Sequence, residues 1–200
     1  MDSVFELLSE MATVPAGPEE YHAEGSVLQH TVLVAEQMAQ LNPDDPVAAL
    51  MAFSHDLGKI ATPVETLPYH YEHDRRGADI ISELPGEFMS TDAKRIASVT
   101  AEQHMRFKKL PQMRASKVIR LVTTLDEAGI TAERMRDLVV ADNRGRIPRQ
   151  STDASEFDAC ISAVRTAQTE LNEEEIANEQ HRLQELVQSY REIREDNSDG

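Results

Sequence analysis

The chain has 200 residues, one cysteine and a formal net charge of −16, with 36 acidic against 20 basic residues. The single cysteine, Cys160, excludes an intrachain disulfide and fits a reducing compartment. No apolar run approaches the roughly 20 residues that cross a bilayer, and the acidic start of the chain does not resemble a signal peptide. We therefore expect a cytoplasmic protein with no membrane partner.

The charge also limits the choice of partners. Lysines are scarce among the basic residues, which favours solubility in high salt and suggests a halophilic source. Such an acidic surface predicts no extended nucleic-acid binding, which needs a basic footprint. A small nucleotide, or the terminus of a nucleic acid, is easier to reconcile with this charge.

Apolar residues recur at helical spacing along most of the chain, and no sustained alternation indicates a sheet. Ser26, Asp45 and Thr131 are suitable N-caps, and Pro46 stands at a first helical position. Gly58 ends the second helix, and residues 62–76 are loop-like. The pattern predicts an all-α fold, with helices over 26–41, 46–57, 77–84, 91–106, 116–128 and 132–143.

The last fifty residues differ from the rest. They carry 13 acids and 4 arginines, a net charge of 4 − 13 = −9. We predict one long helix, or two in series, from about residue 153 to 195, with an apolar stripe from Leu183 to Ile193. The chain then divides into a domain over 1–150 and an acidic helical extension over 151–200. That extension either packs on the domain or forms a homodimer.

The strongest chemical signal is His55-Asp56, at the end of a strongly apolar helix and just before Gly58 and Lys59. A buried carboxylate beside an imidazole is costly unless a group such as a cation compensates it. His30 lies on the apolar face of the preceding helix and meets His55 if the two helices pair antiparallel. Imidazole and carboxylate together suit Ni, Co, Mn, Mg, Fe or Zn without distinguishing them.

These residues resemble the His…His-Asp…Asp signature of the HD-domain superfamily, which comprises all-helical metal-dependent phosphohydrolases. The likeness is greatest to the HD domain of bacterial CCA-adding (tRNA nucleotidyltransferase) enzymes and spans roughly residues 5–147. The motifs that carry it are Tyr21-His22-Ala23-Glu24-Gly25, Ser54-His55-Asp56-Leu57-Gly58-Lys59, Tyr69-His70-Tyr71-Glu72-His73, Ala101-Glu102-Gln103-His104 and Ala141-Asp142-Asn143-Arg144. With no nucleotidyltransferase portion in the sequence, we do not expect this chain to add CCA.

The resemblance implies that His30, His55, Asp56 and a last aspartate bind a first divalent metal ion. That aspartate aligns with either Thr123 or Asp126, and Asp126 is chosen because it supplies a carboxylate. His73 and His104 match the positions that hold a second ion in two-metal members, so one or two ions per chain are expected.

Other residues are candidates for contact with substrate. Lys59 is placed to meet a phosphate oxygen, and Arg75 and Arg76 are candidates to clamp phosphate. His22 either reaches the cleft or orients a metal ligand, and Arg144 or Arg146 is a further candidate for substrate binding. His55, Asp56 and Lys59 are the expected catalytic residues.

The resemblance favours a 2′,3′-cyclic phosphodiesterase, 2′-nucleotidase or phosphatase acting on nucleotides or RNA ends. One alternative is a 5′-nucleotidase or dNTP triphosphohydrolase, as in other HD branches. The other is a regulatory module that binds nucleotides without catalysis, although His30, His55 and Asp56 are all present.

Overall fold

The computed structural model describes residues 4–170 and 179–196. Within these residues the fold is all-α, and the only β-type pairing is an isolated antiparallel bridge between Pro15 and Ser26. The α-helices are α1 (Val4–Thr13), α2 (Val27–Leu41), α3 (Pro46–Ser54), α4 (His73–Glu83), α5 (Thr91–Phe107), α6 (Ala115–Glu127), α7 (Ala132–Gly145), α8 (Ser155–Glu170) and α9 (Glu179–Asp196). The predicted all-α class is confirmed.

Side-chain caps set the starts of several helices. The hydroxyl of Ser26 accepts a hydrogen bond from the Gln29 amide at the start of α2. The carboxylate of Asp45 accepts from the amides of Val47 and Ala48 at the start of α3. These bonds satisfy amides that have no partner inside the helix, which is why the boundaries follow the sequence signals closely.

Three boundaries differ from the prediction. Helix α1 was not expected, and α4 begins at His73 rather than at residue 77, inside the segment read as loop. The run from His73 to Arg76 has no apolar periodicity, but the structure buries His73 and Gly77 on one face of α4. Helix α3 ends at Ser54, so His55 and Asp56 lie just beyond it.

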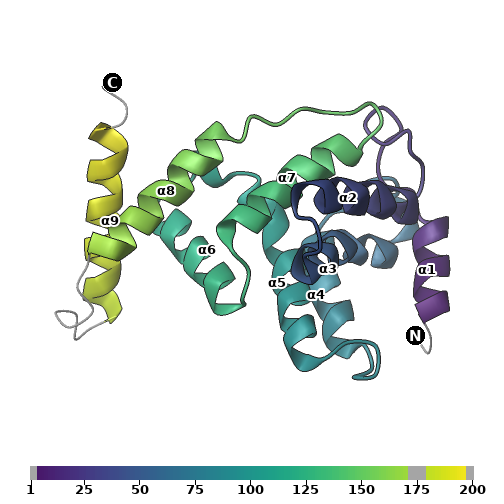
Figure 1. Ribbon diagram of the computed structural model, residues 1–200. Coiled ribbons are helices and arrows are strands. Elements are labelled where there is room, and N and C mark those ends of the chain that lie inside the picture. Colours follow the sequence, from purple (N-terminus) through teal and green to yellow (C-terminus); the bar gives the residue numbers. More distant parts are fainter. Residues whose placement is uncertain (1–3, 171–178, 197–200) are drawn as a thin grey trace.

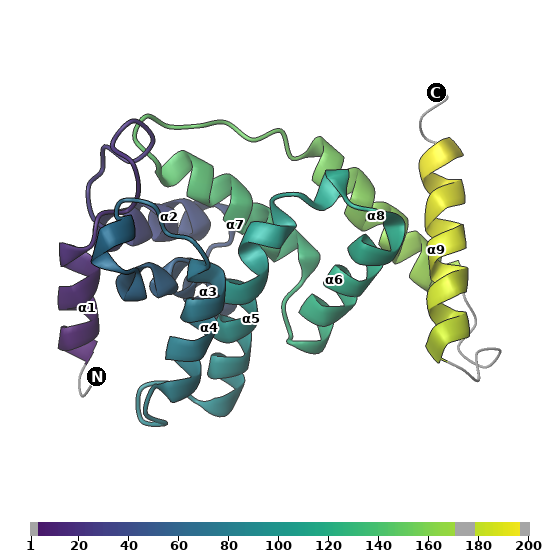
Figure 2. The same cartoon turned by 180° about the vertical axis from the view of Figure 1, so that it is seen from behind.

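The helices form two groups, seen from opposite sides in Figures 1 and 2. Helices α2, α3, α4, α5 and α7 gather with α1 at one side, and α9 lies at the far end beside α8 and α6. The larger hydrophobic core runs through both groups, from Val34 and Met51 to Leu186 and Tyr190. The apolar face of α9 is therefore covered by the core of this chain.

Two short 3-10 helices follow α3: η1 (Leu57–Ala61) and η2 (Val64–Thr66). The first packs against α4, and this contact brings the end of α3 to the start of α4. A Cβ on Gly58 would lie only 1.9 Å from the carbonyl oxygen of His73. Only glycine permits this approach, which sets His55 and Asp56 beside His73.

Among the described residues, no helix has the length and hydropathy needed to span a bilayer.

Candidate metal centre

A buried cluster of histidines and aspartates lies where the helices of the larger group converge. Each of its residues is less than one-tenth exposed. Five helices supply the cluster, whose members are His30 from α2, His55 and Asp56 from the end of α3, His73 from α4, His104 from α5 and Asp142 from α7.

The carboxylate of Asp56 lies between two groups of histidines. Its Oδ2 is 3.3 Å from Nε2 of His55 and 3.5 Å from Nε2 of His30. Its Oδ1 is 3.3 Å from Nε2 of His73 and 3.6 Å from Nε2 of His104. Each oxygen therefore faces a different pair of imidazoles, so Asp56 belongs to both groups of candidate ligands.

Hydrogen bonds to the backbone fix the tautomers of three histidines. Nδ1 of His55 lies 2.8 Å from the carbonyl oxygen of Ala52, and Nδ1 of His104 lies 2.7 Å from that of Ala101. His73 makes the same contact, at 2.7 Å, with the carbonyl oxygen of His70. A carbonyl only accepts, so each Nδ1 carries a proton, and in the neutral form of each ring Nε2 presents a lone pair to the cluster.

The donor set fits divalent metal ions. Nε2 of His55 is buried and has no hydrogen-bond partner. Nε2 of His73 and Nε2 of His104 lie 3.2 Å apart, although neither carries a proton to share in the tautomers just described. A cation facing these nitrogens would give Nε2 of His55 a partner. It would also relieve the repulsion between the lone pairs of His73 and His104. The candidate ligand atoms of His30, His55 and Asp56, and those of Asp56, His73 and His104, each lie within 4.8 Å of one another.

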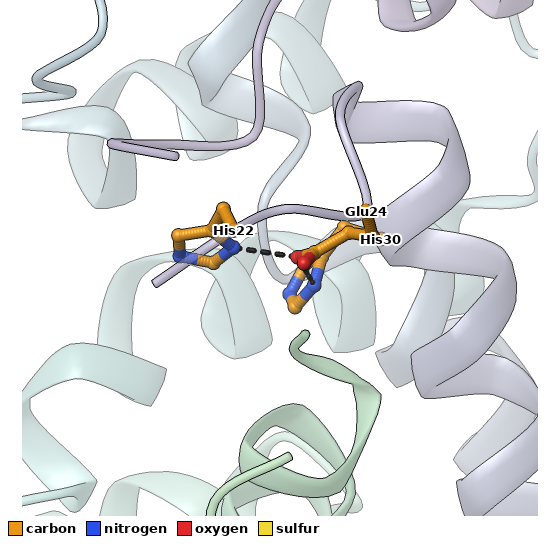
Figure 3. Close-up of side chains that lie close together, drawn as sticks. All are labelled: His22, Glu24 and His30. Carbon is orange, nitrogen blue, oxygen red and sulfur yellow. Dashed lines mark hydrogen bonds and ion pairs between the residues drawn. The ribbon is translucent and has the colours of Figure 1, made fainter. Parts of the chain in front are cut away.

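Glu24 contacts two imidazoles at the edge of the cluster, His30 of the cluster itself and His22 beside it (Figure 3). Its Oε1 lies 2.6 Å from Nδ1 of His22 and 2.9 Å from Nδ1 of His30, between the two rings. Its Oε2 accepts a hydrogen bond of 2.9 Å from the Ile147 amide, just after α7. The contact with Nδ1 leaves Nε2 of His30 directed at Asp56 and Asp142. A carboxylate behind a metal-binding histidine orients the ring and raises its basicity.

The local environment puts Asp56, Asp142 and His104 in the protonation states that a metal site requires. Burial lowers the pKa of His30, but Asp142 and Glu24 outweigh it and raise that pKa. Burial raises the pKa of Asp56, but Lys59 and His55 outweigh it and hold that pKa well below its usual range. Burial likewise raises the pKa of Asp142, and Lys108 and His30 outweigh it. Burial lowers the pKa of His104 to about 4. At neutral pH both aspartates are therefore ionised and His104 is neutral.

A small pocket opens directly above this cluster. Its volume is about 190 Å³, and Asp56, His22 and His73 line it together with Lys59, Lys108 and Arg146. Lys59 Nζ lies 2.7 Å from Asp56 Oδ2 and also donates to the Ala16 carbonyl at 2.7 Å. Lys108 and Arg146 both pair with Asp142. Three cations therefore surround the two aspartates at the entrance to the cluster.

The expected last ligand, Asp126, is not part of this cluster, and that prediction is corrected. Asp126 lies on α6, where both of its oxygens accept from Arg165 of α8 at 2.6 and 2.8 Å, and its side chain is 34% exposed. Asp142 is 1% exposed, and its Oδ1 lies 3.1 Å from Nε2 of His30. The reason is tertiary: α7, not α6, packs along α2.

Three of the four arginines selected from the sequence do not line the pocket, and Arg146 does. Arg75 is exposed, and Arg76 donates to the carbonyl of Tyr71. Arg144 is exposed on the other side of the end of α7, where it borders a different hollow with Leu33 and Gln37. The helical turn places Arg146, not Arg144, over Asp142 and the pocket.

Sequence reasoning overlooked three contributors: Asp142 and Glu24 as functional groups, and Lys108 as a pocket residue. Asp142 belongs to the motif Ala141-Asp142-Asn143-Arg144, and it follows Val139 by three residues and Leu138 by four. This helical spacing indicates that Asp142 lies on the buried face of its helix. An ionisable residue on a buried helical stripe requires a partner. Lys108 follows the end of α5 and carried no comparable signal.

The fold and the cluster together define an all-helical protein with a buried histidine–aspartate centre suited to divalent metal ions. The family model of the HD domain matches residues 27–143, more than half of the chain. This chain therefore belongs to the HD-domain family, whose superfamily comprises metal-dependent phosphohydrolases.

Curated relatives agree with this assignment. The chain is 36% identical over 137 residues to a Multifunctional CCA protein of Actinobacillus pleuropneumoniae, covering 65% of this chain and 33% of the relative. It is 34% identical over 158 residues to a Multifunctional CCA protein of Pasteurella multocida, covering 75% of this chain and 37% of the relative. The chain thus spans about a third of the length of these relatives, and the predicted resemblance to CCA-adding enzymes is confirmed. No solved structure gives a significant match.

Proposed function

We propose that this chain hydrolyses a phosphomonoester or a 2′,3′-cyclic phosphodiester at the end of a nucleotide or an RNA. The observation that carries the proposal is the placement of Asp56. One of its oxygens faces His30 and His55 and the other faces His73 and His104, on the floor of a pocket edged by three cationic side chains.

In this proposal the two halves of the cluster hold two metal ions. His30, His55 and Asp142 would hold the first ion and His73 and His104 the second, with Asp56 available to both. Two such ions supply an acidified water nucleophile and neutralise charge on the phosphate oxygens. Glu24 supports the first ion indirectly, because it keeps Nε2 of His30 directed into the centre.

The basic side chains account for recognition of phosphate. Lys59, Lys108 and Arg146 now neutralise the buried carboxylates. When metal ions supply that positive charge, the same three groups are left to pair with phosphate oxygens. Lysine and arginine bind phosphate strongly through charge-assisted hydrogen bonds. The volume of about 190 Å³ suits a phosphoryl group and the adjoining sugar better than a complete nucleoside triphosphate.

A substrate panel tests the proposal. Purified protein is assayed with added Ni, Co, Mn or Mg against 2′,3′-cAMP, 2′-AMP, a 5′-monophosphate and a dNTP. We expect turnover of the first two, and loss of that turnover in Asp56→Ala. Release of inorganic triphosphate would point instead to a dNTP triphosphohydrolase. Absence of turnover for every substrate and metal, with nucleotide binding retained, would point to a regulatory module.

A further inference from the structure

One segment of this acidic chain is entirely basic in its charged residues. Between Glu102 and Asp126 there is no aspartate or glutamate, and this stretch contains six lysines and arginines. It covers the end of α5, the 3-10 helix η3 (Leu110–Gln112) and most of α6. Its basic residues are Arg106, Lys108, Lys109, Arg114, Lys117 and Arg120.

Four of these side chains line a groove. Arg106, Lys109, Arg114 and Lys117 are exposed and border a hollow of about 690 Å³. Met105 lines both this hollow and the pocket above the metal centre, so the two are adjacent. We name the hollow the basic groove. It begins where the pocket of the metal centre opens, and it continues along the surface of η3 and the start of α6.

The cations of the basic groove lack acidic partners. Within the part of the chain that the structure describes, none of the four forms an ion pair, whereas Arg134, Arg136 and Arg165 all pair with aspartates. Asp74 is the one carboxylate among the residues bordering the groove, and it accepts a hydrogen bond from the Arg75 amide. Four neighbouring cations facing a single carboxylate repel one another, and an anionic ligand would relieve that repulsion.

Two exposed aromatic rings lie at the mouth of the pocket. Tyr69 lines the pocket, and its ring stacks on that of Tyr71, with centroids 6.3 Å apart and planes inclined by 22°. The two residues are 55% and 66% exposed. Large aromatic faces open to solvent beside a phosphate-sized pocket are suited to stacking on a nucleobase.

We propose that the basic groove binds the phosphate backbone of a single-stranded RNA whose terminal phosphate lies in the pocket of the metal centre. The proposal rests on the proposed function, which places that phosphate in the pocket. A single strand is required because the bases must be unstacked to reach Tyr69 and Tyr71 and because the pocket admits only a chain end. The overall charge predicts no extended nucleic-acid contact, but the charge is so unevenly distributed that this surface differs from the rest.

Binding is measured separately from catalysis. The probe is a fluorescein-labelled single-stranded RNA of about ten nucleotides with a free 3′-hydroxyl, which the proposed hydrolysis leaves intact. Fluorescence anisotropy gives the affinity of the metal-loaded protein across a range of salt concentrations. Four backbone contacts predict a slope of log K against log [salt] of about −2.8, from about −0.7 per contact.

Matched variants locate the site of binding. Lys109→Gln combined with Lys117→Gln should weaken binding about tenfold or more and reduce the slope to about −1.4. Arg120 is an exposed cation of the same segment that does not border the groove. Arg120→Gln should therefore leave the RNA affinity and the salt slope unchanged. Tyr71→Leu should weaken binding about fivefold or more through lost stacking. The double variant should still hydrolyse 2′,3′-cAMP at the wild-type rate, because a mononucleotide does not reach the groove.

The outcomes separate this proposal from the proposed function. The proposal that the basic groove binds RNA would be overturned if the protein hydrolysed 2′,3′-cAMP without binding RNA. It would also be overturned if the double variant bound RNA as well as the wild type does. Both outcomes would leave the enzyme assignment intact. Salt-dependent RNA binding that needs Lys109 and Lys117, in a protein that hydrolyses nothing, would support the groove and count against the enzyme. Equal affinity for poly-L-glutamate of similar charge would overturn the assignment to RNA.

Discussion

His30 and Asp142 are 112 residues apart in the chain, yet Nε2 of His30 lies 3.1 Å from Oδ1 of Asp142 in the interior of the protein. The contact joins the first turn of α2 to the last turn of α7. It places the carboxylate that sequence reasoning assigned to Asp126 on a different helix.

Exchange of the two aspartates for asparagine distinguishes their roles. Asp142→Asn keeps the side-chain shape but removes the charge, and we expect the metal affinity to fall at least a hundredfold because a direct ligand is lost. Asp126→Asn should retain the affinity and change the free energy of unfolding by less than about 1 kcal/mol, since its pair with Arg165 is partly exposed. Isothermal titration with Mn or Ni measures the metal affinity of both variants. Equal losses in the two variants would contradict the assignment.

Glu24 should act on the metal through His30 rather than by direct contact. Glu24→Gln removes the charge beside Nδ1 of His30, and the metal affinity should fall about 10- to 100-fold, as is usual for groups that orient a ligand. Glu20→Gln, an exposed carboxylate of the same loop, is the control and should have no effect. An unchanged affinity in Glu24→Gln would show that the position of His30 does not depend on this contact.

The two-ion arrangement predicts a defined stoichiometry. Wild-type protein should contain two divalent ions per chain, and His73→Ala combined with His104→Ala should contain one, because these two histidines face only Oδ1 of Asp56. Metal analysis by mass spectrometry after dialysis gives both values. A single ion in the wild-type protein would instead make His73 and His104 polar residues of the cleft.

Gly58 should tolerate no side chain. A Cβ at this position would lie 1.9 Å from the His73 carbonyl oxygen and 2.3 Å from the Gly77 amide nitrogen, both of which are backbone atoms. We expect Gly58→Ala to lower the free energy of unfolding by about 3 kcal/mol or more and to weaken metal binding. Gly86→Ala, where no atom lies within 4 Å of the added Cβ, should change stability by less than about 1 kcal/mol. Chemical denaturation of both variants compares them directly.

Asp45 links the start of α3 to α7 and should make stability depend on pH. Burial raises the pKa of Asp45, but Arg134 and the amides of Ala48 and Val47 outweigh it and hold that pKa below its ordinary 3.8. A carboxyl whose pKa is lower in the folded state stabilises fully above its unfolded pKa, and that contribution is lost as the pH falls through the lower, folded value.

The matched variants of Asp45 separate its two roles. Asp45→Ala loses both the N-cap and the ion pair and should cost about 1–2 kcal/mol at pH 7, whereas Asp45→Asn keeps the cap and should cost less. The difference in free energy of unfolding between wild type and Asp45→Asn should begin to narrow below about pH 4, where the unfolded carboxyl becomes neutral. It should close once the pH is below the lower, folded pKa. Denaturation curves at pH 7 and pH 3 test this, and a gap that widened at pH 3 would contradict it.

The sequence by itself determined much of this protein. Caps such as Ser26 and Asp45 lie next to the helices they begin, so most helix boundaries follow from local signals. The pairing of His55 with Asp56, placed before Gly58, identified the centre of the site because all three belong to one continuous segment. The family resemblance drew on the same local motifs.

Tertiary structure decided the rest. Helical periodicity shows that Asp126 and Asp142 each adjoin an apolar stripe, but it does not say which stripe faces His30. Packing of α7 along α2 made that choice, and it also placed Arg146 above the pocket. In the same way, the net charge of −16 conceals a surface on which four cations gather, because a sum over the chain contains no positions in space.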